Sequence, residues 1–196
     1  NPLPSKTWYW LHLNDTTVKW NGNVQPCMVT TEEPEQVSEA GLNIKEMTTG
    51  AGAEADTLFS DENLPVLQLT AKAEDGERII RLDISGEDKE NAAGTVYIAT
   101  EENAHVTVIE KFISGKKAQS DLAFRTKLYA KKNSTIRLIQ INMLDEGQRL
   151  LNAVGSVCDE TAKLDVLQMF IGRGDVYNGI QTELEGNQSE LHTEIG

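Results

Sequence analysis

The chain has 196 residues and a net charge of −13, from 31 acidic and 18 basic side chains. This acidic balance disfavours nucleic acid as a partner, because binding to phosphates needs clustered Lys and Arg. The sequence shows no apolar stretch of membrane-spanning length and its first residues lack the pattern of a signal peptide, so we expect a cytoplasmic protein without a membrane partner.

The first thirty residues are rich in aromatic side chains. All three tryptophans, Trp8, Trp10 and Trp20, lie there together with Tyr9. We interpret this segment as a cap over one end of the fold, and a stacking platform for sugars or bases is the alternative.

Residues 31–63 are acidic and interrupted by Pro34 and several glycines. A short helix is predicted over residues 35–40, with Gly41 as its C-cap. Residues 50–53 resemble a phosphate-binding loop only superficially, because no Lys-Ser or Lys-Thr follows. We therefore predict a connector with one helical element.

From residue 64 onward the sequence consists of short β-branched and apolar runs separated by Gly, Asn, Asp and Lys, which predicts a nearly all-β region. The predicted strands are residues 66–69, 79–84, 96–99, 106–112, 124–129, 136–141, 150–157, 164–170 and 180–184.

A short pattern recurs in this region: a small residue, alternating apolar residues, then Glu or Gln. Copies begin at Ala104, Ser134 and Ala162, a partial copy begins at Ser189, and a degraded one begins near Gly76. A repeat of about 28 residues that holds two strands predicts a β-solenoid, in which equivalent strands of successive coils stack as a parallel sheet.

Within each copy the alternating apolar side chains are expected to point inward. Glu110, Gln140 and Gln168 occupy equivalent positions after them. A polar ladder along the stack is one interpretation, but we favour solvated outer positions because such residues are mostly exposed.

The run GTVYIATEENAHVTVIE at residues 94–110 resembles the strand pair that opens the core domain of the SufB/SufD family, scaffold proteins of the SUF iron–sulfur cluster assembly system. The run LYAKKNSTI at residues 128–136 is similar to the next coil, and PSKTWYWL at residues 4–11 is similar to the entrance of SufD-type members. The resemblance implies a right-handed parallel β-helix, with an N-terminal α+β cap and connector over residues 1–63 and a partial core over residues 64–196. It also implies a non-catalytic scaffold that pairs with a SufB-like subunit and a SufC-like ATPase.

Residues 189–195 begin a new coil and then the sequence stops. We expect the chain to be a fragment, truncated at the C-terminal end of the core, because the family continues through further coils to a helical region. The cysteine and histidine that the family uses for the nascent cluster would lie beyond Gly196. We therefore expect no cofactor bound by this chain itself, and a nascent iron–sulfur cluster only in the full complex.

No residue is predicted to be catalytic, to bind a cofactor or to ligate a metal. The three histidines, His12, His105 and His192, have no ligand spacing, and His105 should face outward from its strand. Cys27 and Cys158 are interpreted as buried or inert thiols, with a sulfur-accepting role for Cys158 as the alternative.

Two further features are open to more than one interpretation. Residues 173–175 spell Arg-Gly-Asp, which we interpret as a turn, and the dipeptides at 116–117 and 131–132 as solvated loop lysines. A homodimer is a further expectation. The alternative function is that of an exported or surface β-helix protein that binds or cleaves polysaccharide, because fold alone does not distinguish the two.

Overall fold

The computed structural model describes residues 23–32, 47–59, 64 and 66–196. Its elements are β1 (Gln25–Pro26), β2 (Met28–Thr31), α1 (Ala53–Asp56), a 3₁₀ turn (Thr57–Phe59), β3 (Val66–Ala71), a 3₁₀ turn (Ala73–Asp75), β4 (Glu77–Ser85), β5 (Asn91–Thr100), β6 (His105–Ile113), β7 (Ser120–Ala130), β8 (Thr135–Met143), β9 (Gln148–Cys158), β10 (Lys163–Phe170), β11 (Asp175–Leu184) and β12 (Glu190–Ile195). The nine predicted strands are all confirmed. The helix predicted over residues 35–40 and the N-terminal tryptophans lie outside the described residues.

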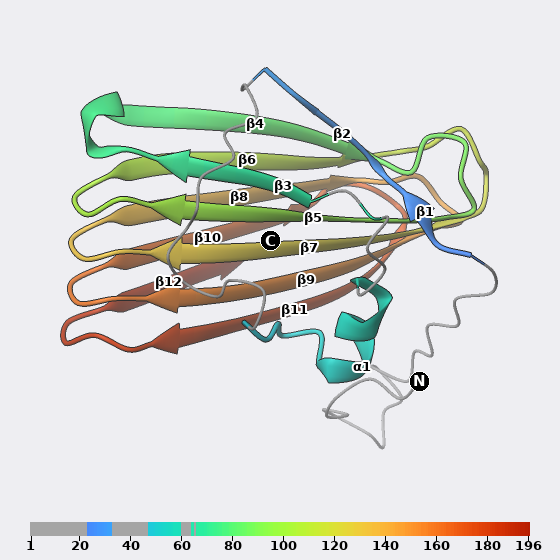
Figure 1. Ribbon diagram of the computed structural model, residues 1–196. Coiled ribbons are helices and arrows are strands. Elements are labelled where there is room, and N and C mark those ends of the chain that lie inside the picture. The colour runs from blue at the N-terminus through green and yellow to red at the C-terminus, as the bar shows by residue number, and fades with distance from the viewer. Residues whose placement is uncertain (1–22, 33–46, 60–63, 65) are drawn as a thin grey trace.

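The strands form two facing sheets that wind into a parallel β-solenoid (Figure 1). One sheet has the order β12-β10-β8-β6-β4-β2, and the other has the order β1-β5-β7-β9-β11 with β3 also paired to β5. Each coil contributes one strand to each sheet, so the predicted β-helix with two strands per coil is confirmed.

The register shows the repeat directly. His105 pairs with Glu77, Thr135 with His105, Lys163 with Thr135, and Glu190 with Lys163, so each coil takes 27 to 30 residues. The three complete copies of the sequence pattern and its partial copy therefore fall on β6, β8, β10 and β12.

The core lies between the two sheets. Equivalent inward side chains of successive coils stack in rows, for example Ile80, Val108, Leu138 and Val166. Phe112 and Phe124 meet edge to face across the sheets, with ring centroids 5.8 Å apart. Because each row continues from coil to coil, burial of these rows is the main favourable contribution to folding.

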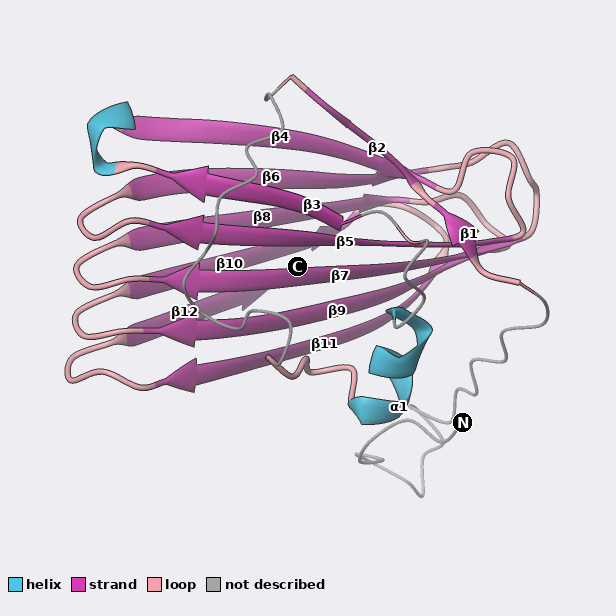
Figure 2. Cartoon of the chain, viewed as in Figure 1, coloured by secondary structure: helices cyan, strands magenta, loops and turns pink. Residues whose placement is uncertain are grey.

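Tight corners join β5, β7, β9 and β11 to the strands that follow them (Figure 2). Each of these corners has a residue at positive φ just before the small residue of the repeat: Asn103 (62°), Asn133 (57°), Thr161 (57°) and Gln188 (60°). Backbone amides at the corners bond to carbonyls of the next corner, as from Asn133 N to Glu160 O at 3.1 Å. The small residue predicted to turn the corner is thus preceded by a residue with a left-handed backbone conformation, which the sequence analysis did not identify.

Replacing Thr161 by asparagine is expected to raise the free energy of unfolding by about 1 kcal/mol, because a β-branched residue is strained at positive φ whereas asparagine adopts it readily. The reverse change at the matching corner, Asn133→Thr, should lower it by a similar amount. Chemical denaturation of both variants tests this. If both changes shift the free energy of unfolding in the same direction, or each shifts it opposite to the direction expected, corner strain does not set the difference.

The described N-terminal residues cover one end of the solenoid. β2 pairs antiparallel with β4, and β1 pairs with the same edge of β5 as β3 does. The thiol of Cys27 occupies the space that a side chain at Gly94 would need. These pairings cover β5 and part of β4 at this end, as a cap does.

Residues 47–52 cross the outer face of β9 and β11. A Cβ on Gly155 would overlap the carbonyl oxygen of Thr48, and one on Gly179 would overlap the backbone of Gly50. Gln181 Nε2 also donates to Thr48 Oγ1 at 2.7 Å. Glycines on two adjacent strands therefore let this segment lie directly on the sheet.

The change Gly155→Ala should displace residues 47–52 without unfolding the solenoid, because the atoms nearest to its Cβ belong to Thr48 and Thr49. Limited proteolysis should then cut near residues 47–52 faster than in the unaltered protein. Gly86→Ala serves as a control, since its φ is not positive and the nearest atom to its added Cβ is Ala92 Cβ at 3.6 Å, an ordinary contact. Unchanged cleavage in Gly155→Ala would mean that the segment does not depend on this contact.

Candidate functional site

The most concentrated polar chemistry in the described residues lies inside the solenoid. Glu110, Gln140 and Gln168 stand in register on β6, β8 and β10, and Asn152 and Asn178 face them from β9 and β11. We call these five residues the interior ladder. Glu110, Gln140, Gln168 and Asn152 are each at most 2% exposed.

Hydrogen bonds join the interior ladder through three coils. Gln140 Nε2 donates to Glu110 Oε2 at 2.7 Å, and Gln168 Nε2 donates to Gln140 Oε1 at 2.6 Å. Asn152 Nδ2 bonds to Gln140 Oε1 at 2.7 Å and to Asn178 Oδ1 at 2.9 Å, and Asn178 Nδ2 bonds to Gln168 Oε1 at 2.6 Å. The amides thus act as donors and acceptors for one another, which removes most of the cost of burying them.

The expectation that Glu110, Gln140 and Gln168 are solvated is wrong, and the ladder interpretation is correct. Strand side chains alternate between faces, so Glu110 lies on the same face as Val106 and Val108, four and two residues earlier. These two valines are in the core. The same parity places Gln140 and Gln168 inside.

Glu110 is the ladder's single carboxyl. Burial raises its pKa to about 7, although hydrogen bonds from Gln140 and Thr126 act in the opposite direction. Thr126 Oγ1 lies 2.9 and 3.0 Å from the two carboxyl oxygens. Glu110 therefore changes charge near neutral pH, inside an otherwise uncharged ladder.

Both thiols are buried, as predicted. Burial raises the pKa of Cys27 to about 12, and burial together with Asp159 raises the pKa of Cys158 to about 11. Neither thiol is a ready thiolate at neutral pH, which argues against the sulfur-accepting alternative for Cys158.

The two histidines that the structure describes lie three strands apart in one sheet. His105 and His192 are exposed on β6 and β12, as predicted for His105, and His12 lies outside the described residues. Within the part of the chain that the structure describes, no three His, Cys, Asp or Glu side chains gather as metal ligands.

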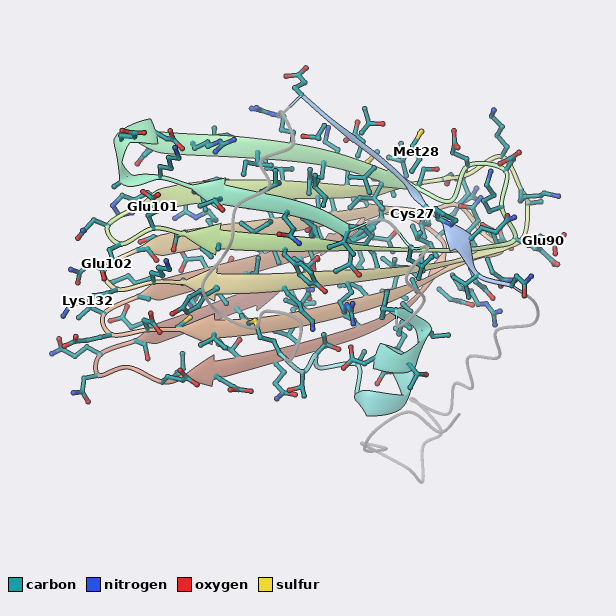
Figure 3. All side chains as sticks on the ribbon, in the orientation of Figure 1. Cys27, Met28, Glu90, Glu101, Glu102 and Lys132 are labelled. Carbon is teal, nitrogen blue, oxygen red and sulfur yellow. The ribbon has the colours of Figure 1, made fainter. Side chains whose placement is uncertain are left out.

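The remaining sequence candidates also lie where they were expected. Residues 172–174 form the bend before β11, with the amides of Arg173 and Gly174 bonded to Leu144 O, so the Arg-Gly-Asp run is a turn. Lys116, Lys117 and Lys132 are exposed in loops, and Lys131 is half-buried. Figure 3 shows Lys132 with Glu101 and Glu102 at the tight corners, far from Cys27.

Comparison with known protein families identifies the family of this chain. The family described as SUF system FeS cluster assembly, SufBD core domain, matches residues 83–195, more than half of the sequence. The chain belongs to this family. No curated protein and no solved structure matches it. The family assignment confirms the resemblance to SufB and SufD proteins and supports a role in SUF iron–sulfur cluster assembly.

On the outer face of the SufBD solenoid, sequence analysis missed one buried cluster. Arg125 on β7 donates to Thr95 Oγ1 at 3.3 Å and to the Tyr97 hydroxyl at 3.4 Å. Its guanidinium also lies 4.8 Å from the Phe59 ring centroid and 3.9 Å from Asp56. The segment around α1 and the following 3₁₀ turn thus packs on the outer face of the sheet and holds a cation there.

Lys127 is the neighbour of Arg125 on the same outer face. It is 1% exposed, and burial, followed by the charge of Arg125, lowers its pKa to about 8. Alternation with Phe124, Thr126 and Leu128 indicates an outward position for both cations, but no local signal shows that a distant segment covers them.

A charged row also follows the strand starts of the SufBD solenoid. Asn91, Asp121, Arg149 and Asp175 are in register on β5, β7, β9 and β11. Arg149 donates to Asp121 through Nε, at 2.6 Å, and through Nη2, at 2.5 Å. A hollow of about 590 Å³ opens beside this row. Because Asp121 already pairs with Arg149, we interpret the row as structural.

Proposed function

We propose that this chain is a SufD-like subunit that acts as a non-catalytic scaffold in iron–sulfur cluster assembly. It would work in the cytoplasm through complex formation with a SufB-like subunit and a SufC-like ATPase. The observation that carries this proposal is the SufBD core match over residues 83–195, on a chain folded as a parallel β-solenoid.

The chemistry of the described residues supports a scaffold role. The interior ladder satisfies its own hydrogen bonds, both thiols are buried with raised pKa, and the described histidines lie apart. A nascent cluster, which is the cargo of the system, would then be held where subunits meet and not by this chain alone. Within the described residues no helix is both long and apolar enough to cross a bilayer.

Co-expression tests the proposal. The tagged chain, produced with SufB-like and SufC-like proteins from the same source, is expected to co-purify with the SufB-like subunit and to recruit SufC through it. An unrelated tagged β-helix protein controls for adhesion to solenoids. Failure to retain either partner, together with binding on a glycan array, would contradict the scaffold role and favour the polysaccharide alternative.

Competition with an untagged SufB-like chain distinguishes the SufD type from the SufB type. A SufD-like chain should bind the SufB-like subunit even when an untagged SufB-like chain is in excess. A SufB-like chain should instead be displaced by that excess and should pair with a SufD-like subunit.

A further inference from the structure

The outer face of the sheet that holds β5, β7, β9 and β11 contains a trough. Across β9 and β11 the register brings together three small residues, Ala153, Gly155 and Gly179. On β7, Arg125 pairs with Ala153 and Lys127 pairs with Gly155, and all five residues are buried. The face is therefore low over β9 and β11, and two long cationic side chains stand beside the low part.

Residues 47–59, which we call the strap, lie in this trough (Figure 1). A Cβ on Gly50 would come within 2.1 Å of Ile180 N on β11, so the strap backbone lies directly on the sheet backbone. At the end of the strap, Phe59 packs with Ala93 and Leu151 of the same outer face. The sheet surface is thus shaped to take an extended backbone with an aromatic side chain at its end.

The strap is attached to the sheet by little hydrogen bonding. Among the described residues, one backbone hydrogen bond joins the two, from Gly50 N to Val154 O at 3.1 Å. Gln181 adds an exposed side-chain bond to Thr48. A segment held by few bonds opens locally at a much lower free energy than the strands beneath it.

The strap is also held together by bonds of its own. Asp56 accepts hydrogen bonds from Thr49 Oγ1 at 3.1 Å and from Thr49 N at 3.4 Å. Gly52 N donates to Thr49 O at 3.3 Å, and Asp56 N donates to Gly52 O at 3.0 Å. None of these bonds uses the sheet, so the strap can leave the trough as a unit.

Two side chains of the strap recognise the cations of the trough. The Asp56 carboxylate lies 3.9 Å from Arg125, and the Phe59 ring centroid lies 4.8 Å from the same guanidinium. Burial and Arg125 lower the pKa of Lys127, and the charge of Asp56 opposes them, so Asp56 acts on both cations. The trough therefore accepts a carboxylate followed three positions later by an aromatic ring.

We propose that the strap is an autoinhibitory segment, and that the trough beneath it binds a segment of a partner protein with the same pattern, an acidic residue followed three positions later by an aromatic one. The strap is tethered to the sheet and competes at a high effective concentration. A free segment therefore binds weakly, whereas a segment presented within a complex is tethered as well and replaces the strap. This inference does not rest on the proposed assembly role.

A labelled peptide with the sequence of residues 47–59 tests the trough by fluorescence anisotropy. The full chain carrying Asp56→Asn and Phe59→Ala should bind this peptide at least tenfold more tightly than the unaltered chain, because its own strap competes less well. A peptide carrying the same two changes is the matched control and should not bind. If the altered chain binds the peptide no better than the unaltered chain does, the proposal is overturned.

A charge exchange tests the contact independently of folding defects. Adding Arg125→Glu to the altered chain should weaken binding of the peptide at least tenfold, and the Asp56→Lys form of the peptide should restore it. Restored binding cannot come from a misfolded chain. Binding that Arg125→Glu leaves unchanged would place the peptide elsewhere and overturn the proposal, and so would a failure of the exchanged pair to bind.

Hydrogen exchange of the unaltered chain tests whether the strap opens by itself. Amides of residues 47–59 should exchange at least tenfold faster than those of β7 and β9, because the strap opens without the solenoid. Equal protection of the strap and these strands would mean that the strap is part of the core, which would overturn the autoinhibitory role.

Discussion

Replacing Glu110 by glutamine is expected to remove a pH dependence of stability that the unaltered protein shows between about pH 4.5 and about pH 7. Glu110 is fully buried, and its pKa rises from 4.5 to about 7 on folding. Glutamine keeps the shape of the carboxyl side chain. Its amide can accept from Gln140 and donate to Thr126, as the neighbouring amides of the ladder do.

The sign follows from proton binding. Between the two pKa values the folded chain holds a proton on Glu110 that the unfolded chain has lost, so the free energy of unfolding falls as the pH rises. The loss is complete above the folded pKa of about 7 and amounts to about 3 kcal/mol. Below about pH 4.5 both states are protonated and this contribution to stability is fully present.

Chemical denaturation from pH 4 to pH 9 measures the effect. Glu110→Gln should be more stable than the unaltered protein at pH 8. Its free energy of unfolding should also depend less on pH, because the contribution of Glu110 is gone. The matched control is Glu102→Gln, which removes an exposed carboxyl at a tight corner. If Glu110→Gln keeps the full pH dependence of the unaltered protein, Glu110 is not the titrating group.

The fold could be predicted from the sequence because its information is local and repeated. The copies at Ala104, Ser134 and Ala162 each specify one corner and one strand, and their spacing alone indicates that equivalent strands stack. A strand that is ambiguous in one copy can be assigned from the equivalent strand in the other copies. The predicted strands were therefore found even where single runs, such as residues 66–69, are short.

The interior ladder was within reach of the sequence but was placed on the wrong face. Parity with Val106 and Val108 indicates that Glu110 points inward, whereas residue type indicates that it is solvated. Parity prevails because the neighbouring coils supply Gln140 and Asn152 as partners, which a single strand considered alone does not reveal.

The outer layer could not be predicted, because it depends on contacts between residues far apart in the sequence. Arg125 is buried by Phe59 and Asp56, about 70 residues earlier, and Gly155 accommodates Thr48, more than 100 residues earlier. Neither glycine nor arginine in a strand identifies its covering segment. α1 is one short turn, too short to give a helical period.

Replacing Gln140 by leucine is expected to lower the free energy of unfolding by about 3 kcal/mol, because each buried polar group left without a partner costs about 1–3 kcal/mol. Gln140 bonds to Glu110, Asn152 and Gln168, so its loss affects three coils at once. Leucine fills nearly the same volume, and the cost is therefore polar. Denaturation at pH 6 measures it, and Gln119→Leu, which changes an exposed amide, should have almost no effect.

A double-mutant cycle separates the bond from the side chains. The first coil already carries Leu82 in the row of Glu110, so leucine is compatible with this position of the solenoid. The double change Glu110→Leu with Gln140→Leu should therefore lower the free energy of unfolding by less than the sum of the two single changes. In the double variant neither polar group of this pair remains buried without its partner. Strict additivity would mean that the two side chains are stabilised separately, and that the ladder is a row of neighbours without coupling between its coils.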